Sequence, residues 1–139
     1  MLIGIVGGPN RGKSTLFKAA TLANVLIANY PFATIAPNKG FGFVRVNDAA
    51  KEFNKVASPR TGYIQGGYRF VPVELLDVAG LVPGAHEGKG KGNQFLDDLN
   101  QADALIQVID ISGSATIDGE PANTGTTDPA EDIRFLEIE

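Results

Sequence analysis

Short apolar runs alternate with glycine-rich or polar stretches along most of the chain. An apolar run of strand length between turn-forming residues predicts a buried strand, whereas apolar positions spaced three or four residues apart predict a helix. The pattern predicts strands over residues 2–6, 42–46, 68–78 and 104–110. It predicts helices over residues 14–21, 48–57, 92–102 and 128–139, the second beginning at Asp48 and the last at Asp128. Strands that alternate with helices indicate an α/β fold with a mostly parallel sheet and helices on both faces.

The connections and the chain end add two expectations. Residues 22–38 show no clean period, so we expect a long ordered loop, and residues 112–127 are polar and loop-like. The last predicted helix has strong start signals in Asp128, Pro129 and Glu131, yet it reaches Glu139 without a C-terminal cap. We therefore expect that the natural protein continues beyond this helix.

Composition narrows the classes of function. The chain has 139 residues, of which 43% are hydrophobic and 20% charged, as in an ordinary soluble domain. Its net charge of −4 gives no general attraction for nucleic acid, and no direct DNA binding is expected. The absence of cysteine and the single histidine, His86, exclude thiolate and multi-histidine metal sites. No apolar run approaches the roughly 18 residues of a membrane span, and the N-terminus lacks signal-peptide features, so we expect a cytoplasmic protein.

A glycine-rich loop follows the first predicted strand and opens a helix. Its sequence, GGPNRGKST, fits the pattern G-x-x-x-x-G-K-[ST] at Gly7, Gly12, Lys13 and Ser14. Backbone N–H groups of such a loop surround a phosphate, and the following helix points its N-terminus at the same anion. Lys13 is expected to neutralise phosphate oxygens and Ser14 to ligate Mg²⁺. The alternative, a glycine-rich turn beside an exposed lysine, is disfavoured by this strand and helix context.

Asn10 lies within the same loop and has two interpretations. Its carboxamide would help to hold a potassium ion beside the phosphates, supplying the positive charge that an arginine supplies in other enzymes. Alternatively, it stabilises the turn locally, as asparagine does in many loops. The sequence favours neither interpretation.

Two further positions fit the sensing of a γ-phosphate. Asp77 and Gly80 form the pattern D-x-x-G at the end of an apolar strand, where the aspartate reaches Mg²⁺ and the glycine N–H reaches the phosphate. Thr34 lies in the long loop between the two motifs, where its hydroxyl would meet Mg²⁺ when the loop closes. The alternatives without a function are that Asp77 and Gly80 form an ordinary turn at the end of the strand, and that Thr34 is simply a polar residue of the loop.

Four stretches together resemble the Obg family of GTPases, most of all its YchF branch in an archaeal style. They are GGPNRGKSTLFKAAT, NYPFATIAPN, DVAGLVPGAHEGKGKGNQFL and ADALIQVID, and the resemblance covers nearly the whole chain. It implies a P-loop NTPase fold, a three-layer α/β sandwich with a mostly parallel sheet. It also implies nucleotide-driven association with the ribosome or its subunits. Residues 1–139 would then be a truncated G domain, followed in the full protein by helical and C-terminal domains.

The resemblance also assigns residues. The expected nucleotide-binding set is Gly7, Pro9, Asn10, Arg11, Gly12, Lys13, Ser14, Thr15 and Gly80, and the expected Mg²⁺ set is Ser14, Thr34 and Asp77. Two positions depart from the family pattern. Arg11 replaces a small apolar residue, and its side chain either points outward or perturbs the loop. The loop that contains Thr34 would be the first switch, and the segment that begins with D-x-x-G the second. Lys91 replaces a leucine, which puts the packing of the second switch in doubt.

The base-reading motif of GTPases, Asn-Lys-x-Asp, does not occur in this chain. It would follow the next strand, beyond residue 139. In the YchF branch this motif can be altered so that ATP is preferred to GTP, so the choice between GTP and ATP stays open. Because the purine pocket would be incomplete, we expect weak nucleotide binding by residues 1–139 alone.

No catalytic residue is certain. Leu81 occupies the position after D-x-x-G where a glutamine would orient the attacking water. His86 lies in the same glycine-rich stretch, but a loop histidine without geometric constraint is more often solvated or in contact with a partner. Potassium held near Asn10 and ordering of the two switches would then supply most of the acceleration. Lys89 and Lys91, in the same stretch, are more readily explained as solvated than as contacts to RNA phosphate.

Three functions remain open at this stage. The first is a regulatory GTPase with slow hydrolysis, or its ATP-preferring counterpart, whose output is a partner-binding state. The second is a nucleotide-gated binding module in which Arg11 or Leu81 has ended hydrolysis. The third, a P-loop kinase for a small molecule, gives no reason for Thr34 or for the aspartate and glycine of D-x-x-G, and is disfavoured.

Overall fold

The structure is a computed structural model, and it describes residues 1–21, 38–78, 80, 97 and 99–138. Thr34, Leu81, His86, Lys89 and Lys91 lie outside the described residues, as does nearly all of the predicted loop 22–38.

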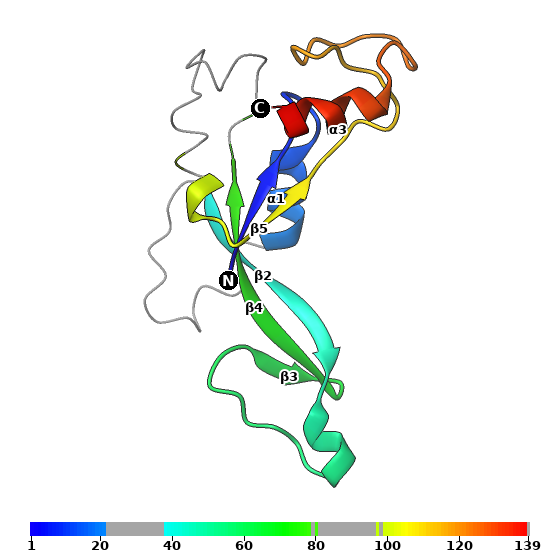
Figure 1. The fold of residues 1–139 in the computed structure, drawn as a ribbon. Helices are drawn as coiled ribbons and strands as arrows, with labels where there is room; N and C mark the ends of the chain where they lie inside the picture. The colour runs from blue at the N-terminus through cyan, green and yellow to red at the C-terminus, as the bar shows by residue number, and fades with distance from the viewer. Residues whose placement is uncertain (22–37, 79, 81–96, 98, 139) are drawn as a thin grey trace.

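The described elements include both strands and helices (Figure 1). They are β1 (Leu2–Val6), α1 (Lys13–Thr21), β2 (Lys39–Asn47), the 3₁₀ helix η2 (Ala49–Phe53), β3 (Tyr63–Gln65), β4 (Tyr68–Asp77), β5 (Ala104–Gln107) and α3 (Pro129–Ile138). The α/β class predicted from the sequence is therefore confirmed. Among the described residues, no helix is long and apolar enough to cross a membrane.

The strands form one sheet in the order β2-β4-β1-β5, with β3 paired to β4 outside this path. β1 runs parallel to both β4 and β5, whereas β2 and β3 run antiparallel to β4. The sheet is therefore parallel around β1 and antiparallel toward β2. The parallel register pairs Ile5 of β1 with Asp77 of β4, so the end of β4 lies beside the beginning of the phosphate loop.

The core is centred on the parallel strands. Val6, Leu76 and Val78 form a buried cluster against which Leu2 and Leu99 pack. Helix α1 lies against β1, β2 and β4. Its approach to β2 is close: a Cβ atom on Gly40 would lie 2.7 Å from Cγ2 of Thr21. A glycine at that position is what allows helix and strand to meet.

Several predicted elements differ from the structure. The predicted helix 48–57 is only η2, although Asp48 does cap it by accepting a hydrogen bond from the N–H of Ala50. The predicted strand 104–110 ends at Gln107. Its first three residues are exposed, because β5 stands at the border of the described sheet with β1 as its neighbour. β3 was not predicted, because a three-residue strand leaves too short a pattern to recognise. Of the predicted helix 92–102, residues 97 and 99–101 are described as helical.

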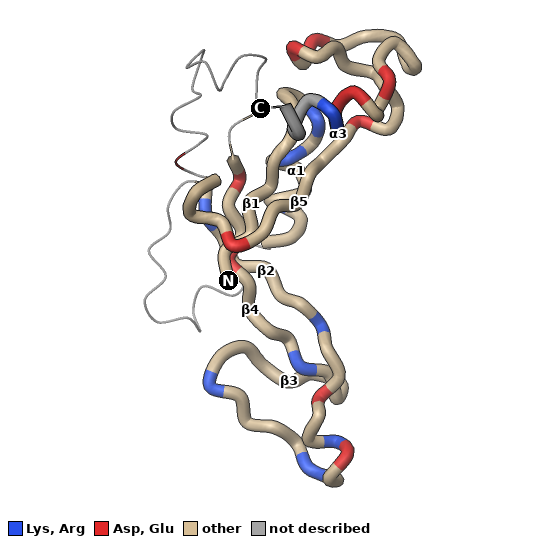
Figure 2. The backbone as a smooth tube through the Cα atoms, viewed as in Figure 1, with Lys and Arg blue, Asp and Glu red and all other residues tan. Residues whose placement is uncertain are grey.

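The far ends of β2 and β4, with η2 and β3 between them, project away from α1 and α3 (Figure 1). We call residues 45–69 the distal lobe. Tyr63 stacks on Phe70 with ring centroids 4.7 Å apart, and Phe43 contacts Tyr63 at 5.3 Å, so aromatic rings anchor the lobe to the sheet. Figure 2 shows several lysines and arginines along this lobe.

Candidate nucleotide site

The phosphate loop connects β1 to α1 through a backbone that glycine makes possible. Gly7 has a φ of 142°, and a Cβ there would lie 2.4 Å from the carbonyl oxygen of Val108. Gly12 has a φ of 89° directly before α1, and its carbonyl accepts the N–H of Leu16 at 2.9 Å. Asn10 also has a positive φ, 55°, in the left-handed region that asparagine tolerates better than most residues. The loop thus curls back before the helix, as the sequence motif predicts.

Lys13 points back into the curve of this loop. Its Nζ atom donates a hydrogen bond to the carbonyl of Gly8 at 2.7 Å, and the residue is 7% exposed. Burial lowers the pKa of Lys13, the nearby carboxylate of Asp77 opposes that shift, and the positive charge of Arg11 adds to it. The amine is therefore desolvated beside a carboxylate, a setting in which an additional anion would be attracted.

Ser14 and Asp77 meet at the mouth of the loop. The Oγ atom of Ser14 donates to Oδ2 of Asp77 at 2.6 Å. The second carboxylate oxygen, Oδ1, is buried and has no hydrogen-bond partner among the described residues. A hydroxyl oxygen beside a carboxylate with an unpaired oxygen is a pair of hard ligands suited to Mg²⁺. The described residues hold no cluster of three or more acidic, histidine or cysteine ligands, so a cation here would need other oxygens, such as phosphates or water.

These residues share one cavity of about 450 Å³. It is lined by Pro9, Asn10, Lys13, Ser14, Asp77, Val78 and Gly80. A Cβ on Gly80 would lie 3.1 Å from Cα of Pro9 and 3.2 Å from Nζ of Lys13, so the D-x-x-G glycine closely approaches the phosphate loop. Both motifs found in the sequence therefore meet at one place. Of the remaining predicted residues, Thr15 is exposed in the first turn of α1 and does not line the cavity.

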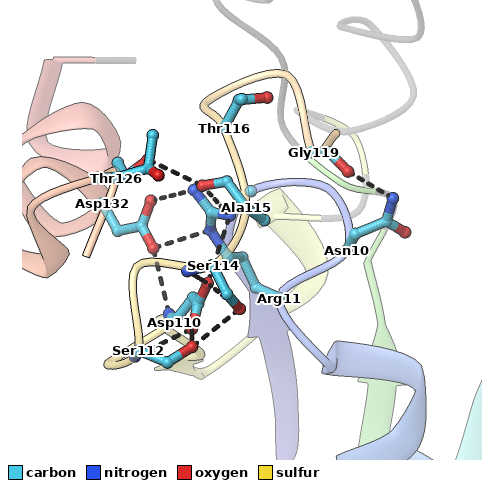
Figure 3. A network of polar contacts seen from close by, with 12 residues as sticks. Asn10, Arg11, Asp110, Ser112, Ser114, Ala115, Thr116, Gly119, Thr126 and Asp132 are labelled. Atoms are coloured by element: carbon cyan, nitrogen blue, oxygen red, sulfur yellow. Dashed lines mark hydrogen bonds and ion pairs between the residues drawn. The ribbon is translucent and has the colours of Figure 1, made fainter. Parts of the chain in front are cut away.

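Arg11 does not line the cavity, and its side chain points toward Asp110 and Asp132 (Figure 3). Its Nε atom pairs with Oδ2 of Asp132 at 2.8 Å, and Nη2 donates to Oδ1 of the same carboxylate at 2.9 Å. Nη1 donates to the carbonyl of Ala115 at 3.1 Å and lies 4.0 Å from Oδ2 of Asp110. The side chain is only 1% exposed. Of the two alternatives for Arg11, this burial excludes a side chain that points outward, and any contact of this residue with phosphate would come from its backbone.

The carboxylates around Arg11 are themselves held in place. Asp110 accepts hydrogen bonds from the hydroxyl and N–H of Ser112 and from the N–H of Ser114. The Ser112 hydroxyl is the main reason that the pKa of Asp110 is lowered, and partial burial opposes it. Asp132, in the first turn of α3, also accepts the N–H of Asp110 at 3.2 Å. Asp110 and Asp132 were not predicted as site residues. The available signal was Asp110, which ends the apolar run 104–110, because the strand in this run is the neighbour of β1 and the phosphate loop follows β1.

The predicted loop 112–127 packs against the phosphate loop. Ala115 and Pro121 form an isolated β-bridge within it, and the N–H of Ala122 bonds to the carbonyl of Ser114 at 2.8 Å. Nδ2 of Asn10 donates to the carbonyl of Gly119 at 2.7 Å (Figure 3). A Cβ on Gly119 would lie 2.6 Å from Cβ of Pro9. No local pattern in the sequence indicates this contact, which joins residues more than a hundred positions apart.

Comparison with known proteins agrees with this geometry. The family model described as a 50S ribosome-binding GTPase matches residues 2–134. The chain belongs to this GTPase family. It is 53% identical to a GTP-binding protein of Methanocaldococcus jannaschii over 97% of this chain and 34% of that protein. It is 39% identical to the ribosome-binding ATPase YchF of Bacillus subtilis, over 98% of this chain and 34% of that protein.

Solved structures give the same result. A GTP-binding protein from Pyrococcus horikoshii superposes with a TM-score of 0.71 at 36% identity, covering 99% of this chain and 31% of that one. The YchF GTPase of Schizosaccharomyces pombe superposes with a TM-score of 0.54 at 32% identity, covering 98% of this chain and 34% of that one. The resemblance to YchF proteins and the P-loop GTPase fold are thereby confirmed. The chain spans about a third of the length of these relatives.

Proposed function

We propose that this chain is the phosphate-binding part of a slow, Mg²⁺-dependent GTPase that regulates an association with the ribosome in the cytoplasm. The observation that carries the proposal is the single cavity in which Lys13, Ser14, Asp77 and Gly80 meet. The family match and the names of the relatives, which include both GTP-binding proteins and ribosome-binding ATPases, support the nucleotide and the ribosomal partner.

The residues of the site have distinct tasks in this proposal. Lys13 would exchange the carbonyl of Gly8 for phosphate oxygens, because a charged amine binds an anion more strongly than a neutral carbonyl. The β-phosphate would be surrounded by backbone N–H groups of residues 7–15. These include the N–H groups of Arg11 and of the residues on either side of Pro9, which has none itself. The N–H of Gly80 would approach the γ-phosphate, since its backbone already lies close to Pro9 and Lys13.

Mg²⁺ fits the oxygens present at this site. Ser14 Oγ and the unpaired Oδ1 of Asp77 would hold it, with Thr34 as a further ligand proposed from the sequence alone. When bound, Mg²⁺ neutralises charge on the phosphate oxygens. The hydroxyl of Ser14 would keep its hydrogen bond to Asp77, because the O–H donates while a lone pair on the same oxygen faces the cation.

Acceleration of hydrolysis would come from positioning rather than from a general base. Asn10 would hold potassium beside the phosphates, and its side-chain oxygen is available because Nδ2 is the atom bonded to Gly119. The alternative is that Asn10 only fixes the loop against residues 112–127. Residues 1–139 alone would bind nucleotide weakly, because the base-reading motif would lie further along the chain.

A phosphate-release assay on the full-length protein tests the proposal against its two alternatives. GTP and ATP are supplied in turn, each with potassium and then with sodium, at constant Mg²⁺. We expect slow turnover that potassium stimulates, and the preferred nucleotide decides between GTPase and ATPase. Tight nucleotide binding without phosphate release under any of these conditions would show a nucleotide-gated binding module instead.

A further inference from the structure

The distal lobe differs in charge from the rest of the chain. Residues 45–69 hold five of the 12 lysines and arginines but only two of the 16 acidic residues, which gives the lobe a net charge of +3. The remaining residues hold seven basic and 14 acidic side chains, a net charge of −7. Such segregation creates a local positive potential in a protein whose overall charge of −4 would repel a polyanion.

The excess of basic over acidic side chains in the lobe is larger at its surface than in its sequence. Of the two acidic residues, Asp48 is 4% exposed, and its oxygens accept the N–H groups of Ala50 and Ala57. Glu52 is therefore the one acidic side chain that the lobe exposes. Its exposed cations are Arg45, Lys51, Lys55 and Arg60, while Arg69 is partly buried. Figure 2 shows basic positions along the part of the tube around β3 and the far ends of β2 and β4, away from α3.

Aromatic rings lie among these cations. Cζ of Arg45 lies 4.8 Å from the ring centroid of Tyr68, and Nζ of Lys51 lies 5.3 Å from it. The register of β2 and β4 pairs Arg45 with Phe70 and Asn47 with Tyr68, which places Arg45 and Tyr68 on one face of the ribbon. Phe53, at the end of η2, is 73% exposed. Phe53 stands between Lys51 and Lys55 in the sequence, so an exposed aromatic ring has a cation two residues away on either side.

The lobe presents these groups on a fixed framework. Asp48 caps the beginning of η2, and Asn54 ends it in the left-handed conformation with a φ of 55°. Tyr63 and Phe70 stack on each other on the same face of the sheet as Arg45, because the register pairs Phe70 with both Arg45 and Tyr63. Arg45, Lys51 and Phe53 are therefore attached to β2 and η2, which reduces the conformational entropy lost when a partner binds. Lys55 and Arg60 lie in the connection between η2 and β3, where the N–H of Lys55 bonds to the carbonyl of Ala50 at 3.0 Å.

We propose that the distal lobe binds RNA. Arg45, Lys51, Lys55 and Arg60 contact phosphates of the strand, and Phe53 stacks on an unpaired base. Cations alone would suit any polyanion, including an acidic protein, but exposed aromatic rings interleaved with cations match single-stranded or looped RNA, whose bases offer a stacking face. The lobe is separate from the nucleotide cavity, so this inference does not depend on hydrolysis, although ribosomal RNA is the source that the proposed function suggests.

The test measures binding of the full-length protein to a fluorescent single-stranded RNA by anisotropy. The first variant is Lys55→Glu/Arg60→Glu, and its matched control is Lys18→Glu/Arg134→Glu, which changes net charge equally at exposed positions on α1 and α3. We expect the lobe variant to lose at least about tenfold in affinity and the control to lose much less. An equal loss in both variants would mean that only net charge matters, and would overturn the proposal.

Phe53→Ala separates stacking from charge. We expect about a tenfold loss of RNA affinity, with binding to heparin unchanged, because heparin has phosphate-like charge but no base to stack. Unchanged RNA affinity would remove Phe53 from the site and overturn the assignment of RNA.

Co-sedimentation with ribosomes tests whether the partner of the lobe is RNA or a protein. If the lobe variant loses ribosome association while the wild-type protein binds no isolated RNA, the lobe contacts a protein and the RNA proposal is wrong. Phosphate release should be unchanged in all lobe variants, which shows that each is folded.

Discussion

Arg11 of the phosphate loop and Asp132 of α3 form a buried ion pair, with contacts of 2.8 Å and 2.9 Å and side chains 1% and 7% exposed. The arrangement explains how an arginine is accommodated in a loop that we propose binds phosphate. The guanidinium is occupied by carboxylates and the carbonyl of Ala115, so its side chain does not enter the cavity. The same contacts link the phosphate loop to the beginning of α3.

Removing Arg11 should destabilise the fold. In Arg11→Met, the buried carboxylate of Asp132 loses its cation, and breaking one side of a buried pair costs about 3–5 kcal/mol. We expect a loss of this order in the free energy of unfolding, measured by urea denaturation. The double variant Arg11→Met/Asp132→Asn should lose clearly less than the sum of the two single variants. Strict additivity would show that the two residues do not stabilise each other.

The contact of Gly119 with Pro9 should matter for nucleotide binding. Gly119→Ala adds a Cβ 2.6 Å from Cβ of Pro9 at a φ of 84°. Gly125→Ala is the matched control, since its φ is 82° but nothing lies within 4 Å of the added atom. Both variants carry similar backbone strain, so a loss of nucleotide affinity confined to Gly119→Ala would come from displacing the phosphate loop. Equal losses in the two variants would attribute the effect to strain alone.

The two interpretations of Asn10 make different predictions. If Asn10 holds potassium, Asn10→Ala abolishes the stimulation of phosphate release by potassium and leaves the rate in sodium nearly unchanged. If Asn10 serves only to contact Gly119, its removal lowers the rate equally with both ions. We expect the first result. Potassium stimulation that survives in Asn10→Ala would place the ion elsewhere or exclude it.

His86 is expected to contribute little to catalysis. His86→Ala should keep phosphate release within a few-fold of wild type, because a general acid or base would contribute about a hundredfold or more. Steady-state kinetics of the full-length protein measure this directly. A loss of about a hundredfold would assign the chemistry to the histidine and remove the need for potassium.

The parts of the fold that follow local rules could be predicted from the sequence. The phosphate loop, α1 and the end of β4 were predicted correctly because glycine positions and apolar runs specify them over a few residues. One rule was enough to predict that the two motifs meet: parallel strands end at the same edge of a sheet. This rule brings together the four residues of the cavity, Lys13, Ser14, Asp77 and Gly80.

The remaining features depend on contacts between distant residues. The pair of Arg11 and Asp132 spans 121 positions, and nothing near either residue indicates the other. The packing of Gly119 on the phosphate loop is equally distant, and the antiparallel pairing of β2 and β3 with β4 depends on how the sheet assembles. A polar, glycine-containing stretch such as 112–127 has no period from which such docking could be derived.

Calorimetric titration of nucleotide into the full-length protein tests the central claim most directly. GTP and ATP are titrated with Mg²⁺ into wild type, Lys13→Ala and the control Lys18→Ala, which removes an exposed lysine of the same helix. A charged hydrogen-bonding partner of phosphate is worth about 1.5–3 kcal/mol, so Lys13→Ala should bind the preferred nucleotide about tenfold to a hundredfold more weakly. Lys18→Ala should bind like wild type. Equal affinity of Lys13→Ala and wild type would contradict the assignment of this loop as the phosphate site.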